Sequence, residues 1–490
     1  MRKKFGLLLI FIALFFMMEV NALDFSNPSS IYEIASIPSS EEKISSEYEF
    51  VPKYIDGVTT METFGANWVR VTASNLVYIF PEDLQKGTIG IIYKNVGYYK
   101  GMKIDLKITI EDWDRFIDNN SGKIIYYTNH IAHGQQGYNF IDQTWEFINS
   151  ETNEPVNLST YLTFLDIDEL QGFEFSSNTS KAITSFYVPV NNSIISYKIN
   201  DNNKYCIFEA SNKGSNMDPD SEITVLFSNI SSIRFKWGTD FKTGKVSPAL
   251  VYLENDYVGG YFVYKAQKPL QSETTVPFEV IYDPNEENKL EHYLAGLHEE
   301  FKYVITHNVP GEETAFYYQK YVFQNKVDDI LNVNQVLIYD IKGNEVTSLF
   351  DITIEENTVT ATLKRTYLNN SDFYYNTYFF HIVVQIKDEI DLSQMNAYYN
   401  NGYYSFVNYS SINVDDLTKT SNLVTTYYLE NDLNGDGICD LDCDSNVDVP
   451  NEIINPKTGS LLSYGLFFGS VTLAIILYYI YYRKQKIFDL

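Results

Sequence analysis

The segment KIDLKITI at residues 103–110 alternates polar and apolar residues without a break. A period of two places successive side chains on opposite faces, which is the pattern of a β-strand with one buried face. The segment NTVTATL at residues 357–363 shows the same alternation. Strand-favouring residues are abundant along the chain, and turn residues separate the alternating runs. We therefore predict an all-β fold of tandem antiparallel β-sandwich domains.

Two further segments refine this prediction. The tyrosine-rich residues 374–384 (YYNTYFFHIVV) are expected to form a strand whose rings fill the core and pair across strands rather than bind a ligand. Residues 290–297 (LEHYLAGL) carry a short apolar period close to 3.6 residues, so a brief helix is expected there.

Composition excludes several classes of protein. The 490 residues include 36 Lys and Arg against 64 Asp and Glu, a net charge of -28 that repels the phosphates of nucleic acids. The hydrophobic fraction of 44% and the aromatic fraction of 16% suffice for large cores, so most of the chain is not disordered. Three cysteines are too few for a disulfide-rich scaffold. The chain is long enough for roughly two or three packed domains.

The N-terminal residues 1–22 have the features of a secretory signal peptide. The cations of residues 1–4 (MRKK) precede an apolar run at residues 5–18, and residues 20–22 (VNA) form a small-residue cleavage pattern. The apolar run is shorter than the ~20 residues that span a bilayer. We predict export, with an uncleaved membrane anchor as the alternative.

The C-terminal region predicts a single transmembrane helix. Residues 461–482 are apolar and long enough to cross a bilayer, and Arg483, Lys484 and Lys486 follow at once. Cations beside a span stay on the cytoplasmic side, so the residues before it lie outside the cell. We expect a single-pass membrane precursor with a cytoplasmic C-terminus.

A pentapeptide stands ahead of this span, formed by Asn455, Pro456, Lys457, Thr458 and Gly459. The order of pentapeptide, apolar span and basic tail resembles the cell-wall sorting signal of Gram-positive surface proteins. The resemblance implies that a sortase-type transpeptidase cleaves between Thr458 and Gly459 and joins the chain to peptidoglycan. Asn455 replaces the usual Leu, which leaves the class of transpeptidase open. The alternative is a chance loop before a permanent membrane anchor.

The region between the two ends divides into a flexible leader (23–48) and a first β-rich domain (49–271). EPVNLSTYLTFLDID at residues 154–168, with WEF at 145–147 and IRFKWG at 233–238, resembles the N-terminal β-rich regions of Gram-positive wall-anchored adhesins. Three acidic residues near the end of this block are candidates for binding a cation or a sugar hydroxyl, with a plain polar turn as the alternative: Asp166, Asp168 and Glu169.

Residues 272–430 form a second predicted domain. The runs FKYVIT (301–306), VDDIL (327–331) and SNLVT (421–425) resemble, in this order, the isopeptide-forming domains of fimbrial and adhesin shafts. In that family, a Lys on the first strand condenses with an Asn on the last strand, a buried acid assists, and ammonia leaves. Such chemistry requires burial, because burial lowers the pKa of the amine and raises that of the acid.

The resemblance assigns a role to four residues of the second domain. Asn422 takes the acceptor position, and Asp328 or Asp329 is the acid. Glu286 stands where the family has its Lys, so Lys289 is the nearest substitute. The alternative is a sandwich that keeps the fold without the bond.

The acidic stem at residues 431–454 contains DLNGDGICD, which matches the start of a calcium-binding loop. Cys443 stands where an EF-hand requires Glu, so the segment resembles thrombospondin type 3 repeats instead. We expect structural calcium held by side-chain oxygens and one backbone carbonyl, that of Ile438; the side-chain ligands are Asp432, Asn434, Asp436, Asp440, Asp442 and Asp444. The alternative is a disordered acidic linker.

The cysteines and histidines give weaker signals. Cys439 and Cys443 can form a small disulfide or remain thiols, and Cys206 is expected as a buried thiol. His130 and His133 have a suggestive spacing, but the flanking residues indicate a loop rather than a zinc site. The sequence contains none of the common motifs of hydrolases, phosphate-binding loops or dinucleotide-binding folds.

These observations predict an extracellular, cell-wall-anchored adhesin or structural surface protein, with an unknown host or glycan ligand and no enzymatic activity. Two alternatives remain open. One is a wall-bound, glycan-acting enzyme, since paired carboxylates are abundant in so acidic a chain. The other is a permanent single-span membrane receptor.

Overall fold

The computed structural model describes residues 43–80, 84–115, 122–165, 171–187, 195–199, 205–209, 223–239, 259–265, 272–282, 289–312, 314–388, 390, 399–400 and 403–429. The predicted signal peptide, calcium stem, sorting signal and transmembrane segment lie outside these residues, as do Asp166, Asp168 and Glu169. Within the described ranges, no helix combines the length and the apolar character needed to cross a membrane.

The fold is all-β, as predicted, and its N-terminal part is a sandwich of two eight-stranded antiparallel sheets. The first sheet has the order β1 (Thr60–Phe64), β4 (Ile89–Tyr99), β5 (Met102–Arg115), β8 (Tyr138–Asn149), β15 (Ser232–Thr239), β10 (Gln171–Phe175), β13 (Tyr205–Glu209) and β12 (Ile195–Ile199). The second has the order β11 (Ile183–Tyr187), β14 (Ile223–Ile230), β9 (Leu158–Leu165), β16 (Gly259–Lys265), β7 (Ala132–Gln136), β6 (Lys123–Tyr127), β3 (Leu76–Ile79) and β2 (Val69–Val71).

The core of this first sandwich follows from the alternation in the sequence. On β5, Ile104, Leu106, Ile108 and Ile110 are fully buried and join one large apolar cluster between the two sheets. This burial pattern confirms the predicted strand at residues 103–110. A short helix, α3 (Ser177–Ala182), lies beside β14 and β15.

The C-terminal part, which we call the second sandwich, contains three further sheets around a second core. The first of them has the order β17 (Phe278–Tyr282), β19 (Glu300–Val309), β24 (Asn376–Ile386) and β21 (Leu331–Asp340). The next has the order β18 (Glu291–Leu294), β29 (Val424–Tyr428), β26 (Tyr403–Asn408) and β25 (Tyr399–Asn400). The last has the order β22 (Phe350–Glu355), β23 (Thr358–Leu363), β20 (Tyr321–Lys326), β27 (Ser410–Val414) and β28 (Leu417–Thr420). Strands β18 and β29 pair in parallel, and the other neighbouring strands of these three sheets pair antiparallel. A short helix, α4 (Arg365–Leu368), follows β23.

Three sequence predictions can be compared with these sheets. Residues 357–363 lie mostly in β23 and residues 374–384 mostly in β24, so both strands are confirmed. The brief helix expected at residues 290–297 is wrong, because the structure has strand β18 there. Parallel pairing with β29 places His292 and Leu294 on the buried face, and this tertiary pairing overrides the weak local period.

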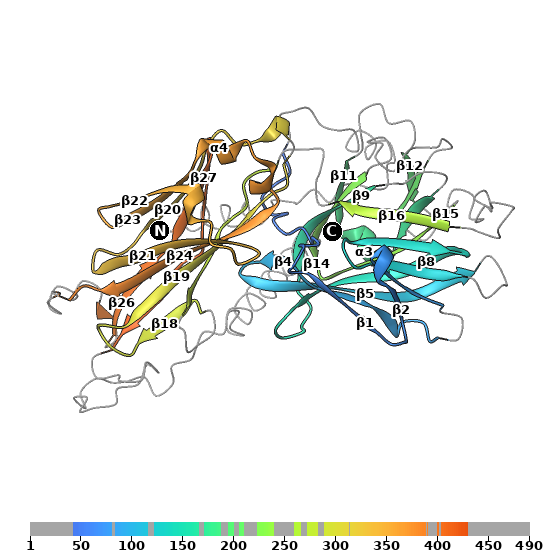
Figure 1. Ribbon diagram of the computed structural model, residues 1–490, viewed down its shortest axis with the longest axis horizontal. Helices are drawn as coiled ribbons and strands as arrows, with labels where there is room; N and C mark the ends of the chain where they lie inside the picture. Colours follow the sequence, from blue (N-terminus) through green and yellow to red (C-terminus); the bar gives the residue numbers. More distant parts are fainter. Residues whose placement is uncertain are drawn as a thin grey trace, which may run out of the picture.

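The two sandwiches lie next to each other along the long axis of the molecule, with the segment before β1 between them (Figure 1). Ile44 forms a bridge with Ser272 at the start of the second part, and Phe50 forms a bridge with Thr160 on β9. Both apolar side chains are buried. The last residues of the expected leader are therefore part of the packed structure.

Candidate functional site

The junction of the two sandwiches is a packed contact. The Asn308 side chain, at the end of β19, donates to the backbone carbonyl of Tyr98 on β4 over 2.9 Å. The Tyr98 ring packs edge-on against Phe379 of β24, with 5.0 Å between ring centroids. Gly101, in the turn between β4 and β5, has a φ of +72°, and a Cβ there would lie 2.9 Å from the Phe278 ring. The turn reaches the second sandwich because it has no side chain at this position.

A buried lysine also joins the two parts. Lys53 belongs to the segment before β1, yet its Nζ donates to the carbonyl of Tyr375 over 3.1 Å and lies 4.7 Å from the centre of the Tyr375 ring. Only 7% of the residue is exposed, and this burial lowers the pKa of the amine to about 7. A hollow of about 30 Å³ lies beside it, which is room for a water molecule.

A larger cleft of about 570 Å³ opens at the same junction. Its apolar wall comes from both sandwiches: Tyr99, Val276, Pro277 and Phe278. Its polar lining comes mainly from the segment between them: Ser45, Ser46, Glu47 and Glu49, with Lys100, Ser159 and Asn422. Clefts of this size at domain junctions commonly bind small ligands or single side chains.

Glu49 is the unusual group of the cleft. The residue is half-buried, and burial raises the pKa of its carboxyl to about 7, although the positive charge of Lys100 acts in the opposite direction. Lys100 is exposed, and its Nζ lies 5.1 Å from the centre of the Tyr99 ring. The cleft therefore combines a poorly solvated carboxyl group, an aromatic wall and one exposed cation.

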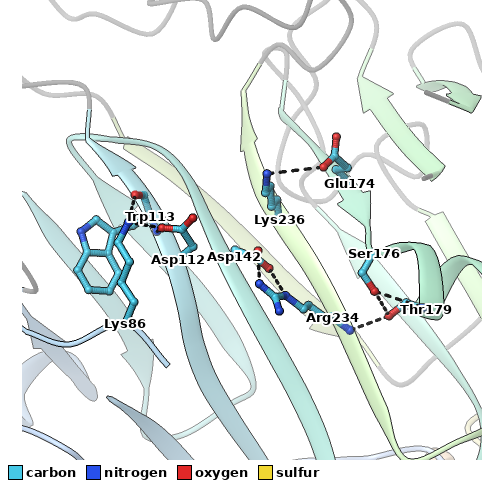
Figure 2. A network of polar contacts seen from close by, with 9 residues as sticks. All are labelled: Lys86, Asp112, Trp113, Asp142, Glu174, Ser176, Thr179, Arg234 and Lys236. Atoms are coloured by element: carbon cyan, nitrogen blue, oxygen red, sulfur yellow. Dashed lines mark hydrogen bonds and ion pairs between the residues drawn. The ribbon is translucent and has the colours of Figure 1, made fainter. Parts of the chain in front are cut away.

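A second candidate surface is the outer face of the first sheet. Figure 2 shows carboxylates and cations from β5, β8, β10, β15 and the turn before β4 paired along this face. Arg234 Nε and Nη2 donate to the two carboxylate oxygens of Asp142 over 3.1 and 2.9 Å. The Arg234 backbone N–H donates to the hydroxyl of Thr179 in α3 over 2.9 Å, which helps to position the residue.

The lysines of this face are held in the same way. Lys86 pairs with Asp112, and both residues are labelled in Figure 2 beside Trp113. The Lys86 Nζ lies 5.1 Å from the centre of the Trp113 ring. Burial alone would raise the pKa of Asp112, but the hydrogen bonds from Lys86 and the Trp113 N–H keep it below its ordinary value. Lys236 likewise lies between Glu174, at 3.7 Å, and the ring of Phe140. Charges already paired within the sheet favour a stabilising role for this face over ligand binding.

A buried carboxyl group organises the second sandwich. Glu279 on β17 is fully buried and accepts hydrogen bonds from Asn408, Ser410 and Ser421 over 2.5, 2.7 and 3.1 Å. Burial raises the pKa of its carboxyl to about 7, while these hydrogen bonds act to lower it. Asn325 on β20 donates to the Ser410 hydroxyl over 2.7 Å and extends the network. We call these five residues the Glu279 network.

The residues predicted to form an isopeptide bond lie around β17. The Asn422 side chain accepts from the N–H of Glu279 and donates to its carbonyl, both over 2.8 Å, so it substitutes for a neighbouring strand. Lys289 makes the corresponding backbone pair with Ile281 along the same edge. The Lys289 residue is exposed.

The two predicted acids lie in the turn between β20 and β21. Asp328 is half-buried and accepts from the N–H of Ile330 over 3.1 Å, while Asp329 is exposed. The structure therefore brings Lys289 and Asn422 to one edge of β17, but none of the four predicted residues is fully buried. The buried acid beside Asn422 is Glu279, which the sequence analysis did not single out. Alternation in β17 places Glu279 on the same face as the core residue Ile281, and this was the available signal.

The histidines and the cysteine that the sequence singled out lie on or beside strands of the first sandwich. His133 is fully buried on β7 between the rings of Tyr126 and Trp237, and burial lowers its pKa to about 3. His130 stacks on Tyr127 before β7. Within the described ranges, no group of three or more His, Cys, Asp or Glu side chains is arranged to hold a metal ion. Cys206 lies on β13, between β10 and β12.

No protein-family model matches this chain, and no curated protein sequence matches it. Several solved structures of Gram-positive adhesins and pilins show low similarity. The N-terminal domain of the Streptococcus gordonii adhesin Sgo0707 has 12% identity and a TM-score of 0.34, covering 81% of this chain and 98% of that one. The Bacillus cereus major pilin subunit BcpA has 16% identity and a TM-score of 0.25, covering 48% and 64%. The C-terminal domain of the Streptococcus pyogenes antigen I/II-family protein AspA has 8% identity and a TM-score of 0.26, covering 59% and 92%. Similarity at this level carries no argument about activity or partners.

Proposed function

We propose that the chain is an exported surface protein, attached to the cell wall by a sortase-type transpeptidase, that serves adhesion or surface architecture. The observation that supports this most is the C-terminal order of NPKTG, apolar span and basic tail. Cations beyond a span cost several kcal/mol each to move into the bilayer centre, so the tail would hold the pentapeptide at the outer membrane surface. A transpeptidase cysteine would then attack the carbonyl of Thr458, the Thr458–Gly459 bond would break with the amine of Gly459 leaving, and an amine of peptidoglycan would release the acyl-enzyme.

Extraction from cells tests this proposal. The wild-type protein should require a wall-degrading enzyme for release, whereas a double variant, Thr458→Ala with Gly459→Ala, should be extracted by detergent. A matched control is Lys457→Ala, which leaves the cleaved bond unchanged and should remain in the wall. Full extraction of the wild type by detergent, with Leu490 still attached, would support the permanent single-span receptor instead.

A calcium-stiffened stem is the second part of the proposal. The carboxylates of residues 432–444 stand two or four positions apart and repel one another without a cation. Protease cleavage near residues 435–437 should rise with a chelator and fall again on adding calcium. The Asp436→Ala variant should be cleaved under both conditions. Equal cleavage of the wild type with and without calcium would leave the disordered linker.

An isopeptide bond in the second sandwich is the third part. Condensation of Lys289 with Asn422 would release one ammonia, so the intact mass of the protein would fall by that amount, whereas Asn422→Ala would show the full sequence mass. An unchanged wild-type mass would leave a sandwich held by the Glu279 network alone. The rival wall-bound enzyme predicts hydrolysis of cell-wall glycans by the purified protein, which an adhesin or structural protein does not.

A further inference from the structure

We propose that the junction cleft binds the cationic side chain, lysine or arginine, of an extracellular polypeptide, with Glu49 as the carboxylate that receives it. The proposal deepens the surface function proposed above by giving its unknown ligand a chemical class. The cleft proposal depends on the proposed surface function in one respect, which is that the ligand is outside the cell. Binding by the purified protein does not depend on wall attachment, so the two proposals can fail separately.

The first step is the state of the Glu49 carboxylate. Within the described part of the chain, it accepts no hydrogen bond and forms no ion pair, and Lys100 acts on it only at longer range. A half-buried carboxylate without a partner is unfavourable, because it has lost part of its hydration and gained nothing in return. Ordinary ion pairs elsewhere in the molecule, such as Asp142 with Arg234, show how the chain satisfies other partly buried carboxylates. Among the described residues Glu49 has no partner, so its carboxylate is the group of the cleft that an external cation can pair with.

The second step is the shape of the cleft. Its volume of about 570 Å³ exceeds what one side chain needs, so a side chain and part of its backbone can enter together. Tyr99, Pro277 and Phe278 form an apolar wall suited to an aliphatic stem, and the aromatic faces attract a cation. The 40% exposure of Val276, at the same wall, leaves apolar surface for such a stem to cover.

The charge around the cleft also favours a cationic ligand. Of the described residues that line the cleft, Glu47 and Glu49 are acidic and Lys100 is the one cation, and the whole chain carries a net charge of -28. This field attracts cationic ligands and repels anionic ones. A neutral glycan would satisfy the hydroxyl groups of the cleft but would leave the Glu49 charge unpaired. A cationic side chain neutralises that charge and uses the apolar wall at the same time.

Binding of this kind depends on pH. Glu49 must be ionised to receive a cation, and its raised pKa of about 7 means that acid removes the binding group. Among the described residues, the other acidic and basic groups that face the cleft are Glu47, from the same segment, and Lys100, from the turn between β4 and β5; Lys53 and Glu273 face the adjoining hollow. We expect affinity to fall about tenfold between pH 8 and pH 6, which follows from simple titration of one group near pH 7.

The test uses the full-length chain in a non-ionic detergent with Nα-acetyl-lysine amide as the probe. Its Nε-acetylated counterpart has nearly the same shape without the charge. We expect saturable binding of the charged probe by ligand-observed NMR and at least about tenfold weaker binding of the neutral one, the size of one partly desolvated charge pair. Glu49→Gln should weaken binding by about the same factor at pH 8 and remove the pH dependence. Glu355→Gln, an exposed position on β22, changes the net charge equally and should have no effect.

Two further variants alter exposed residues of the cleft, which are not needed for folding. Val276→Arg should block the cleft. Lys100→Ala removes the competing cation and should strengthen binding at alkaline pH, where Glu49 is ionised in both proteins. Equal binding of the charged and neutral probes would overturn the proposal in favour of an apolar or glycan ligand. Charged-probe binding that Glu49→Gln leaves unchanged would also overturn it, as would the absence of binding at millimolar probe.

Discussion

Replacing Glu279 with glutamine isolates the effect of one buried acid on the second sandwich. The change keeps the size of the side chain and most of its contacts with Asn408, Ser410 and Ser421. The NH₂ group of the glutamine replaces one carboxylate oxygen and therefore faces a hydrogen-bond donor. This contact lowers the free energy of unfolding by an amount that does not vary with pH. The pH-dependent effect of the substitution comes only from the loss of the titrating carboxyl group.

The magnitude follows from the raised pKa. The Glu279 pKa is about 7 in the folded protein, against an ordinary value of 4.5. The folded state therefore binds the proton more tightly than the unfolded state, so this contribution to the stability of the wild type is fully present below pH 4.5 and is lost as pH rises to about 7. At about 1.4 kcal/mol per pKa unit, the loss is about 3 kcal/mol. The glutamine side chain does not titrate, so the variant should gain about 3 kcal/mol relative to the wild type between pH 4.5 and pH 8.

Urea unfolding at a series of pH values measures this difference. All four tryptophans, Trp68, Trp113, Trp145 and Trp237, belong to the first sandwich, so tryptophan fluorescence reports that part alone. Tyrosine signals in the near-ultraviolet circular dichroism report the second sandwich as well. We expect the variant to shift only the tyrosine-detected transition.

The difference between the variant and the wild type is the quantity to follow. Other buried groups also titrate, including His133 and His307, whose pKa values burial lowers to about 3. Both proteins share these groups, so their effects cancel. A difference in free energy that stays constant from pH 4.5 to pH 8 would refute the reasoning, because it would mean that Glu279 titrates normally in the folded protein.

Three further predictions concern the junction and the first sheet. Burial lowers the Lys53 pKa to about 7, so the wild type should lose stability as pH falls from about 10 towards 7, where an unfolded lysine takes up a proton and Lys53 does not. Lys53→Met should abolish this loss, and fluorescence-detected unfolding measures it. Gly101→Ala should cost about 1–3 kcal/mol, from its positive φ and the clash with Phe278, and small-angle scattering should show whether the sandwiches separate. Asp142→Asn should cost about 1 kcal/mol by fluorescence-detected unfolding, because the Arg234 guanidinium it binds is partly exposed; no change would mean that the pair contributes nothing.

Local pattern predicts well wherever one strand is considered by itself. The alternation at residues 103–110 and 357–363 predicts β5 and β23, because the period of two is imposed by strand geometry and by one buried face. It failed at residues 290–297, where pairing of β18 with β29 decides the structure. A short apolar run fits a strand or a helix equally well until its neighbour is known.

Local sequence patterns did not predict the polar contacts around β17. Asn422 was singled out as a covalent acceptor, and the structure shows its side chain completing the edge of β17 by pairing with the backbone of Glu279. Glu279 and Ser410 are separated by 131 positions in the sequence, and their contact exists only because β17 and β27 pack together. Neither residue stands in a recognisable motif.

The sequence by itself determined that this chain is acidic and built of β-strands, and it predicted export at one end and wall sorting at the other, because composition, period and short motifs are local properties. Only the tertiary structure decided which of the acidic residues in its described part are buried away from water and which are paired with a cation or a hydrogen-bond donor. Glu49 and Glu279 carry the same side chain as their exposed counterparts. Their raised pKa values arise from burial by segments distant in sequence, and burial is a property of the packed molecule.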